Sequence, residues 1–199
     1  MRVSSVFLLA LSAQLLGAPK VANPSFEAKR FAKWPGYVGA NGGVIPGWQH
    51  SGKEGVNPVF EPREGKPPRV RHAFSDNGRI THGKQVGFIQ NTGRISQKVP
   101  GFEKGKTYRV LFLENARDNH APERNPKLKV TLGGKLIVSE HAVKPVDGFE
   151  TRRVPYARVE SATFTAPADG AFELVFEATF GDRVAVLLDH VRIEEVKQP

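Results

Sequence analysis

The stretch "PGFEKGKTY" at 100–108 contains the residue types of a phosphate-binding loop, with Gly105, Lys106 and Thr107 in succession. A nucleotide-binding loop requires G-x-x-x-x-G-K-[ST] between a strand and a helix, so that backbone amides surround the phosphates. Here the position five before Gly105 is Pro100, and the residues after Thr107 alternate as they would in a strand. The run therefore predicts a turn that leads into a strand, and it argues against nucleotide binding.

The sequence also lacks the common catalytic motifs. It has no G-x-S-x-G elbow and no H-E-x-x-H motif, and its six histidines show no metal-ligand spacing. The absence of cysteine excludes disulfides, thiolate metal sites and a cysteine nucleophile. Two carboxylates could hydrolyse a glycosidic bond, but the sequence does not pair the candidates, which are Glu61, Glu64, Glu114, Asp118 and Glu177. We therefore expect a non-catalytic protein, with a polysaccharide-active enzyme as an alternative.

Alternation of apolar and polar residues predicts strands, and no segment after residue 18 has sustained helical periodicity. In "TYRVLFLENAR", Tyr108, Val110 and Phe112 share one face, while Asn115 and Arg117 lie on the other. Further strands are expected in "GAFELVFEATF", "QVGFIQ", "GRISQKV", "ESATFTAP" and "VAVLLDHVRIEEV", and "KLKVTLGGKLIV" predicts a hairpin. Short strands separated by Gly/Pro turns indicate an all-β protein, an antiparallel β-sandwich of the jelly-roll type.

Glu114 follows Phe112 on the face of its strand that is expected to be buried. This position predicts either a carboxylate whose pKa is perturbed by burial or the point at which the strand leaves the core.

Two segments differ from the predicted strands. Residues 1–18 have a basic start, a short apolar run and a small-residue end, as in a secretory signal peptide. The apolar run is shorter than the roughly 20 residues that span a membrane. Residues 52–84 are rich in Gly, Pro and Arg and alternate little, which predicts a long loop. We therefore expect a secreted protein, extracellular or periplasmic, with one β-sandwich domain at 19–199 and no membrane span.

The formal net charge of +9 at pH 7 comes from basic residues dispersed along the chain. A positive surface attracts polyanions, and for a secreted protein these would be acidic polysaccharides or the cell envelope. A nucleic-acid surface would require a basic stripe with interleaved aromatic residues, which is not evident in this sequence. The charge therefore predicts either an acidic glycan partner or general solubility, and it argues against nucleic acid. The sequence does not determine the oligomeric state.

Five motifs in order along the chain resemble the galactose-binding-like jelly rolls of secreted carbohydrate-binding modules. They are "NPSFE" (23–27), "IPGW" (45–48), "GRISQKV" (93–99), "GKTYRVLF" (105–112) and "LLDHVRI" (187–193). The resemblance covers residues 21–196. It implies two antiparallel sheets, with 23–27 opening the first strand and 187–193 closing the last.

The resemblance also implies a structural calcium ion between the first and last strands, with Glu27 and Asp189 at the matching acidic positions. Asp189 lies within an apparently core-facing row of apolar residues, which are Ala185, Leu187, Val191 and Ile193. A buried carboxylate needs a cation or several hydrogen-bond donors, and calcium takes roughly six to eight oxygen ligands. Asp189 is therefore expected to bind calcium; the alternative is that it lies at a bulge or accepts backbone hydrogen bonds.

In such modules aromatic rings cover the apolar face of a sugar, while amide and guanidinium groups bind its hydroxyls. The residues that we expect to bind a glycan are Trp34, Tyr37, Gln90, Asn91, Asn115, Arg117, Asn119 and His120. Trp48 is expected in the core rather than in a sugar platform, and Gln97 has the alternative of bonding backbone at a sheet edge. We therefore predict a carbohydrate-binding protein. The alternative is a structural or adhesion domain of the cell envelope that binds proteins.

Overall fold

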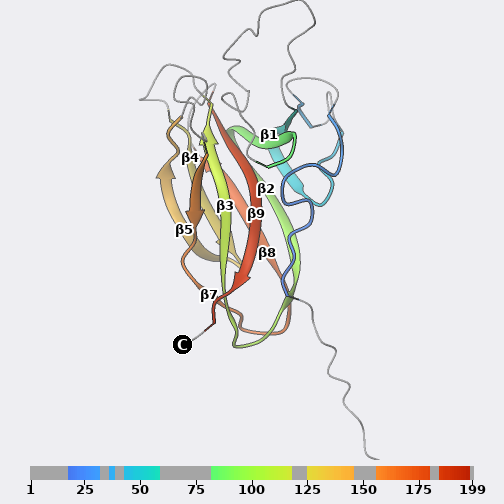
Figure 1. The fold of residues 1–199 in the computed structure, drawn as a ribbon. Coiled ribbons are helices and arrows are strands. Elements are labelled where there is room, and N and C mark those ends of the chain that lie inside the picture. Colours follow the sequence, from blue (N-terminus) through green and yellow to red (C-terminus); the bar gives the residue numbers. More distant parts are fainter. Residues whose placement is uncertain are drawn as a thin grey trace, which may run out of the picture.

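The computed structural model describes residues 18–31, 36–38, 43–58, 82–117, 125–145, 156–179 and 184–197. Within these ranges there is no α-helix, and nine strands form one curled antiparallel sheet that folds into two layers (Figure 1). The predicted all-β sandwich is confirmed, but the two antiparallel sheets that the resemblance implied are two layers of one continuous sheet. None of the described residues belongs to a helix long and apolar enough to cross a membrane.

The strands follow the chain in the order β1 (Gln49–Pro58), β2 (Gln85–Phe102), β3 (Thr107–Ala116), β4 (Lys127–Leu132), β5 (Lys135–Ala142), β6 (Ala157–Glu160), β7 (Phe164–Thr165), β8 (Gly170–Thr179) and β9 (Ala185–Glu195). Across the sheet the order is β5-β4-β8-β2-β9-β3-β6, while β1 pairs with β2 and β7 pairs with β3.

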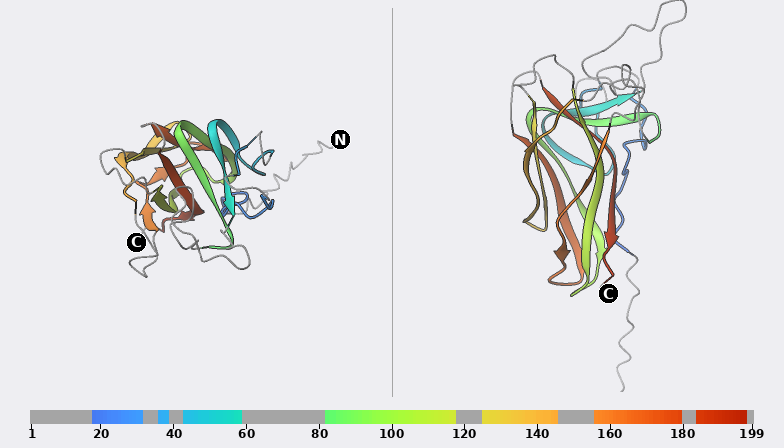
Figure 2. Two further views of the ribbon diagram at one scale, coloured as in Figure 1. Left: turned by 90° about the horizontal axis from the view of Figure 1, so that it is seen from above. Right: turned by 60° about the vertical axis from the view of Figure 1, so that its left-hand side comes forward.

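Strand β2 connects the two layers because it bends at Asn91. Residues 87–90 pair with β9, and residues 92–102 pair with β8. Asn91 has φ +61°, in the left-handed region that asparagine tolerates better than most residues. The segments "QVGFIQ" and "GRISQKV" are therefore two halves of one strand, not two strands. Figure 2 shows β1 and the first half of β2 crossing one end of the long strands.

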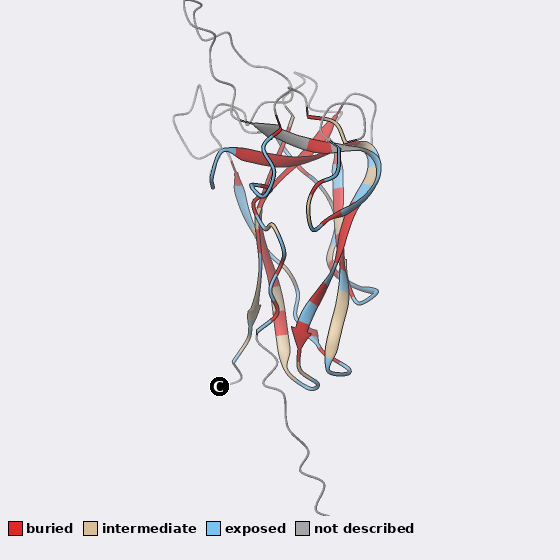
Figure 3. Ribbon diagram, turned by 90° about the vertical axis from the view of Figure 1, so that its right-hand side faces the viewer, coloured by how far each residue is buried: buried red, intermediate tan, exposed pale blue. Residues whose placement is uncertain are grey.

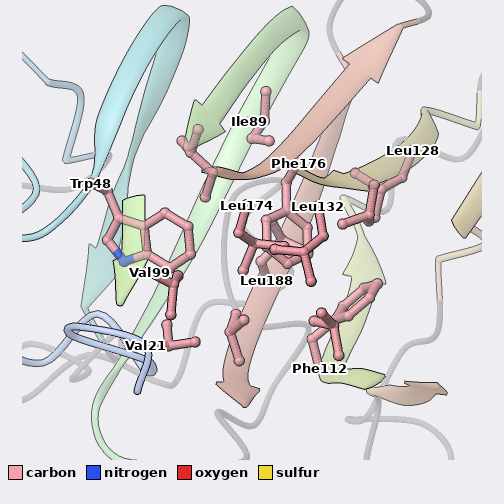
Figure 4. Close-up of a cluster of buried hydrophobic side chains, with 14 of the residues drawn as sticks. Val21, Trp48, Ile89, Val99, Phe112, Leu128, Leu132, Leu174, Phe176 and Leu188 are labelled. Carbon is pink, nitrogen blue, oxygen red and sulfur yellow. The ribbon is translucent and has the colours of Figure 1, made fainter. Parts of the chain in front are cut away.

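The main core lies between the two layers, where buried residues line the inner faces of the strands (Figure 3). Phe176 packs edge-on against Phe112 and Trp48, with ring centroids 5.0 and 6.1 Å apart. Trp48 also stacks on Phe26 at 5.6 Å and is 5% exposed, so its predicted place in the core is confirmed (Figure 4). Burial of these aromatic rings, together with the aliphatic core, stabilises a chain that has no disulfides.

Two predicted turns are confirmed. The pair Gly133-Gly134 joins β4 to β5, with φ of +56° and +79°. The stretch that resembled a phosphate loop connects β2 to β3, and Gly105 there has φ +80° and donates its N–H to the carbonyl of Ala166. β3 then runs between β9 and β6 with Tyr108 buried, as the alternation predicted.

Residues 23–27, which the resemblance placed at the start of the first strand, do not form a strand. Asn23 and Phe26 have positive φ, and the Phe26 N–H donates to the Asn23 carbonyl at 3.2 Å, which makes a turn. Side chains of β2 hold this segment in place of a sheet ladder. The Gln97 side chain accepts from the Ala22 N–H at 2.8 Å and donates to the Ala22 carbonyl at 3.2 Å. The alternative role of Gln97, bonding to backbone, is thus confirmed.

Two expectations fall largely outside the described residues. Of the predicted signal peptide at 1–18, the structure describes Ala18 alone. The loop expected over 52–84 begins later than predicted, because β1 continues to Pro58, and residues 59–81 are not described.

Candidate functional site

The first residues of β9 bring three of the predicted ligand-binding residues together. Gln90 pairs with Ala185 across the β2–β9 ladder, and the Asn91 N–H donates to the Val184 carbonyl at 2.9 Å. On the other edge of β9, the Arg117 N–H donates to the Ala185 carbonyl, also at 2.9 Å. Gln90 and Arg117, which are 27 positions apart in the sequence, thus lie on either side of the first residue of β9.

Tyr37 joins this group from the N-terminal segment. Its hydroxyl donates to Gln90 Oε1, and its ring packs edge-on against Phe88 with centroids 5.4 Å apart. Partial burial raises the pKa of Tyr37, although the nearby Arg117 charge and the Gln90 hydrogen bond oppose that shift. Tyr37 therefore contacts Gln90, and the Arg117 charge is close enough to act on Tyr37; we refer to these three residues with Asn91 as the Tyr37 cluster.

Close backbone approach allows Tyr37 to reach this position. Tyr37 makes an isolated antiparallel bridge with Gly55 of β1. A Cβ atom on Gly55 would lie 2.2 Å from the Gly36 carbonyl oxygen and 2.6 Å from Phe88 Cζ. Only glycine fits there, so Gly55 sets the position of the Tyr37 ring above β2.

An apolar layer lies beneath the Tyr37 cluster on the face of the sheet opposite the main core. Val86, Phe88, Tyr156 and Leu187 are buried there, and Leu113 packs against them. The alternation of β3 already placed Leu113 on this face, whereas no sequence pattern pointed to Tyr156. This layer gives the polar cluster a rigid apolar base.

The remaining predicted ligand-binding residues do not join the accessible part of the cluster. Asn115 pairs with Leu187 across the β3–β9 ladder, but it is 1% exposed and its Oδ1 accepts from the Ala116 N–H. Trp34, Asn119 and His120 lie outside the described residues.

The two predicted calcium ligands lie close to one another at a different place. Asp189 is fully buried and accepts from the N–H groups of His190 at 2.7 Å and His82 at 3.0 Å. Glu27 Oε1 accepts from the N–H groups of Lys84 at 2.7 Å and Gln85 at 2.6 Å. The segment 82–85, immediately before and at the start of β2, therefore contributes donors to both carboxylates.

Asp189 immediately precedes a bulge, which corrects the predicted core-facing row. His190 has φ +51°, and the β3–β9 register shifts between Leu111 and Leu113. Before the bulge, Leu187 faces the apolar layer beneath the Tyr37 cluster. After the bulge, Val191 faces the main core. The predicted alternative, a bulge with backbone hydrogen bonds to Asp189, is confirmed.

The residues at this place also fit a cation. Burial, with a smaller contribution from the Glu27 charge, raises the pKa of Asp189 to about 7, against the two backbone N–H donors. The buried Ser25 hydroxyl lies close enough to oppose the shift, yet it makes no hydrogen bond of normal geometry. Within the described ranges no third acidic or histidine ligand joins them, so backbone carbonyl oxygens would complete the coordination of calcium.

No pair of candidate catalytic carboxylates comes together among the described residues. Glu177 makes an ion pair with Lys129 at 3.0 Å, and Glu114 makes one with His141 at 3.0 Å. Glu61, Glu64 and Asp118 are not described. Glu114 is 7% exposed, which confirms the predicted perturbation by burial.

No family model matches the chain, and no curated protein matches it by sequence. Solved structures do match its fold. A family 61 carbohydrate-binding module in complex with β-1,4-galactotriose matches with a TM-score of 0.51 and 16% identity, over 87% of this chain and 96% of that module. A CBM22-1 xylan-binding domain from Paenibacillus barcinonensis Xyn10C matches with a TM-score of 0.50 and 15% identity, over 88% and 93%.

The tandem CBM22-1–CBM22-2 domain of the same enzyme matches with a TM-score of 0.52 and 16% identity, over 91% of this chain and 47% of the tandem. The chain therefore has the β-sandwich fold of carbohydrate-binding modules, as the motif order implied.

Proposed function

We propose that this protein is a secreted, non-catalytic carbohydrate-binding protein whose ligand contacts the Tyr37 cluster. The observation that supports the proposal is the contact of the Tyr37 ring with the Gln90 amide above a buried apolar layer, with the Arg117 charge acting on the same tyrosine. Such a set can cover the apolar face of a sugar and bind its hydroxyl groups. The fold shared with carbohydrate-binding modules agrees with this role.

Asn91 would extend the polar edge of the site, since it is half-buried at the bend of β2. Asn115 would act from beneath the surface by holding the end of β3. Trp34, Asn119 and His120 remain predicted contacts. The presence of Arg117 favours a ligand that includes acidic sugars, because a guanidinium binds carboxylates with two parallel hydrogen bonds.

A panel of neutral and acidic polysaccharides tests the proposal. We expect at least one glycan to bind, and we expect Tyr37→Ala and Arg117→Ala each to weaken binding at least about tenfold. Arg192→Ala is the matched control, because Arg192 is an exposed arginine at the opposite part of β9. Folded protein that binds no glycan at millimolar concentration would contradict the proposal and favour an envelope domain that binds proteins.

We further propose that Glu27 and Asp189 hold a structural calcium ion. The ion would neutralise two neighbouring carboxylates and attach the turn at 23–27 to β9. It would have no part in ligand chemistry.

A further inference from the structure

Strand β5 is the edge of its layer, and within the described ranges it pairs with β4. That pairing is irregular, with register shifts between Leu128 and Val130 and between Val130 and Thr131. The far end of β5 therefore has a weaker backbone ladder than the central strands, and other contacts must hold it against the opposite layer.

One such contact joins β5 to β3 across the sandwich. His141 Nε2 lies 3.0 and 3.1 Å from the two carboxylate oxygens of Glu114, and His141 Nδ1 lies 3.1 Å from the Ser139 carbonyl oxygen. A carbonyl and an ionised carboxylate can only accept hydrogen bonds. Both ring nitrogens must then carry a proton, so the geometry is that of a charged imidazolium bound to a carboxylate.

We propose that Glu114 and His141 form a pH-dependent clamp that fastens the end of edge strand β5 to β3, closed in mildly acidic solution and released when His141 loses a proton. The pair is distinct from the Tyr37 cluster and from the two predicted calcium ligands, and the clamp does not rest on glycan binding.

The strength of the contact should depend on the charges of both side chains, because the pair is partly shielded from water. The Glu114 side chain is 9% exposed and that of His141 is 33% exposed. Burial raises the pKa of Glu114, which the positive charge of His141 opposes. Burial alone would lower the pKa of His141, but the Glu114 charge and the Ser139 and Leu128 backbones outweigh it, so the net shift is upward.

Charged residues of the neighbouring strands β4 and β6 make ion pairs with other partners; in β6, Arg158 lies 2.8 Å from Glu160. Lys127 and Lys129 of β4 pair with Glu140 and Glu177 on the exposed face of their layer. Glu114 is therefore the charge that acts on His141.

The direction of the pH effect follows from these shifts. A histidine with a raised pKa in the folded state adds stability below its unfolded-state pKa, about 6.5, and that stability is lost as the pH rises through the folded-state pKa. Above it, Glu114 remains as a buried carboxylate without a cationic partner. Below the raised pKa of Glu114 its carboxyl group is neutral, and the ion pair is also lost. The clamp is therefore complete only at pH values between the folded-state pKa of Glu114 and that of His141.

The test compares melting temperatures from pH 5.5 to 8.5 at a fixed calcium concentration for wild type, His141→Gln and Glu114→Gln. His50→Gln is the control, because His50 is an exposed histidine of β1. We expect the advantage of wild type over His141→Gln to shrink by about 3–10 °C between pH 6 and 8.5, while His50→Gln follows wild type.

An NMR titration of wild type supplies a second readout that needs no variant to fold. The pKa of the His141 imidazole should lie above its ordinary value. Parallel melting profiles of wild type and His141→Gln, or an unshifted or lowered His141 pKa, would overturn the clamp.

Discussion

A buried carboxylate such as Asp189 must be compensated by hydrogen-bond donors, a cation or a proton. Two backbone N–H groups supply part of this compensation, but the pKa near 7 indicates that they do not offset burial next to Glu27. A cation would restore the ionised form at neutral pH. The nearby Ser25 hydroxyl, which makes no normal hydrogen bond, could then act as a further oxygen ligand.

We therefore expect a chelator to lower the melting temperature of the wild-type protein at pH 7.5 and excess calcium to restore it. A gain of about 3 kcal/mol, expected at a calcium concentration roughly 100 times Kd, corresponds to about 5–10 °C for a chain of this size. Asp189→Asn should melt at the same temperature with and without chelator. Asp169→Asn, at an exposed aspartate near the β2–β3 turn, should respond as wild type does. A wild-type melting curve unaffected by chelator would argue against the ion.

At the scale of elements, the N-terminal segment shows that side-chain amides can replace a strand ladder. The Gln97 side chain bonds both polar groups of the Ala22 backbone. The Gln85 side chain accepts from the Phe31 N–H at 2.9 Å and donates to the carbonyls of Phe26 and Lys29. Both glutamines are buried, so few water molecules can take over these bonds.

Gln97→Leu should therefore destabilise the protein by about 1–3 kcal/mol, because it removes both hydrogen bonds to the Ala22 backbone at nearly constant side-chain volume. Chemical denaturation with a two-state fit measures this change in the free energy of unfolding. The neighbouring, exposed Lys98→Leu should change it by less than about 0.5 kcal/mol. Equal effects of the two substitutions would show that the amide bonds to Ala22 add little.

Elements that bury one face were predictable, and those set by distant contacts were not. Strand β8 and the first half of β3 alternate between buried and more exposed residues, and Gly133-Gly134 marked the hairpin, because these signals are local. The turn at 23–27 depends on glutamines more than 50 positions away, and the bend at Asn91 depends on β2 changing partners from β9 to β8. No short window of sequence contains that information.

The same limit applied to the candidate site. The residue types suited to sugar were recognisable, and Gln90, Asn91 and Arg117 meet because the pairing of β9 places them around Ala185. Asn115 was expected on an accessible face, but it is 1% exposed, and buried apolar residues such as Leu187 share that face of the sheet. Alternation assigns a residue to a face of the sheet, but it does not show what covers that face.

For the whole molecule, the two outer faces carry alternating charges that largely neutralise one another. Arg109 lies between Glu160 and Glu194 at 3.2 and 3.4 Å on one layer, and Lys129 pairs with Glu177 on the other. Each exposed pair adds little stability, but among the described residues such pairs balance charges of opposite sign on the strand faces. The net charge of +9 is therefore expected to attract polyanions diffusely, through long-range electrostatics, rather than through one face.

This distribution predicts two binding modes that salt should separate. Diffuse attraction to a polyanion such as heparin should disappear near 1 M NaCl, where the Debye length falls to about 3 Å. It should be the same in wild type and Tyr37→Ala, because the substitution leaves the net charge unchanged. Binding of a neutral glycan through the Tyr37 cluster should largely persist in high salt, since ring stacking and amide hydrogen bonds are short-ranged, and it should be weakened in Tyr37→Ala. Affinity electrophoresis at two salt concentrations measures both modes of binding. If salt abolished glycan binding and heparin binding in parallel, charge rather than the Tyr37 cluster would account for the glycan binding.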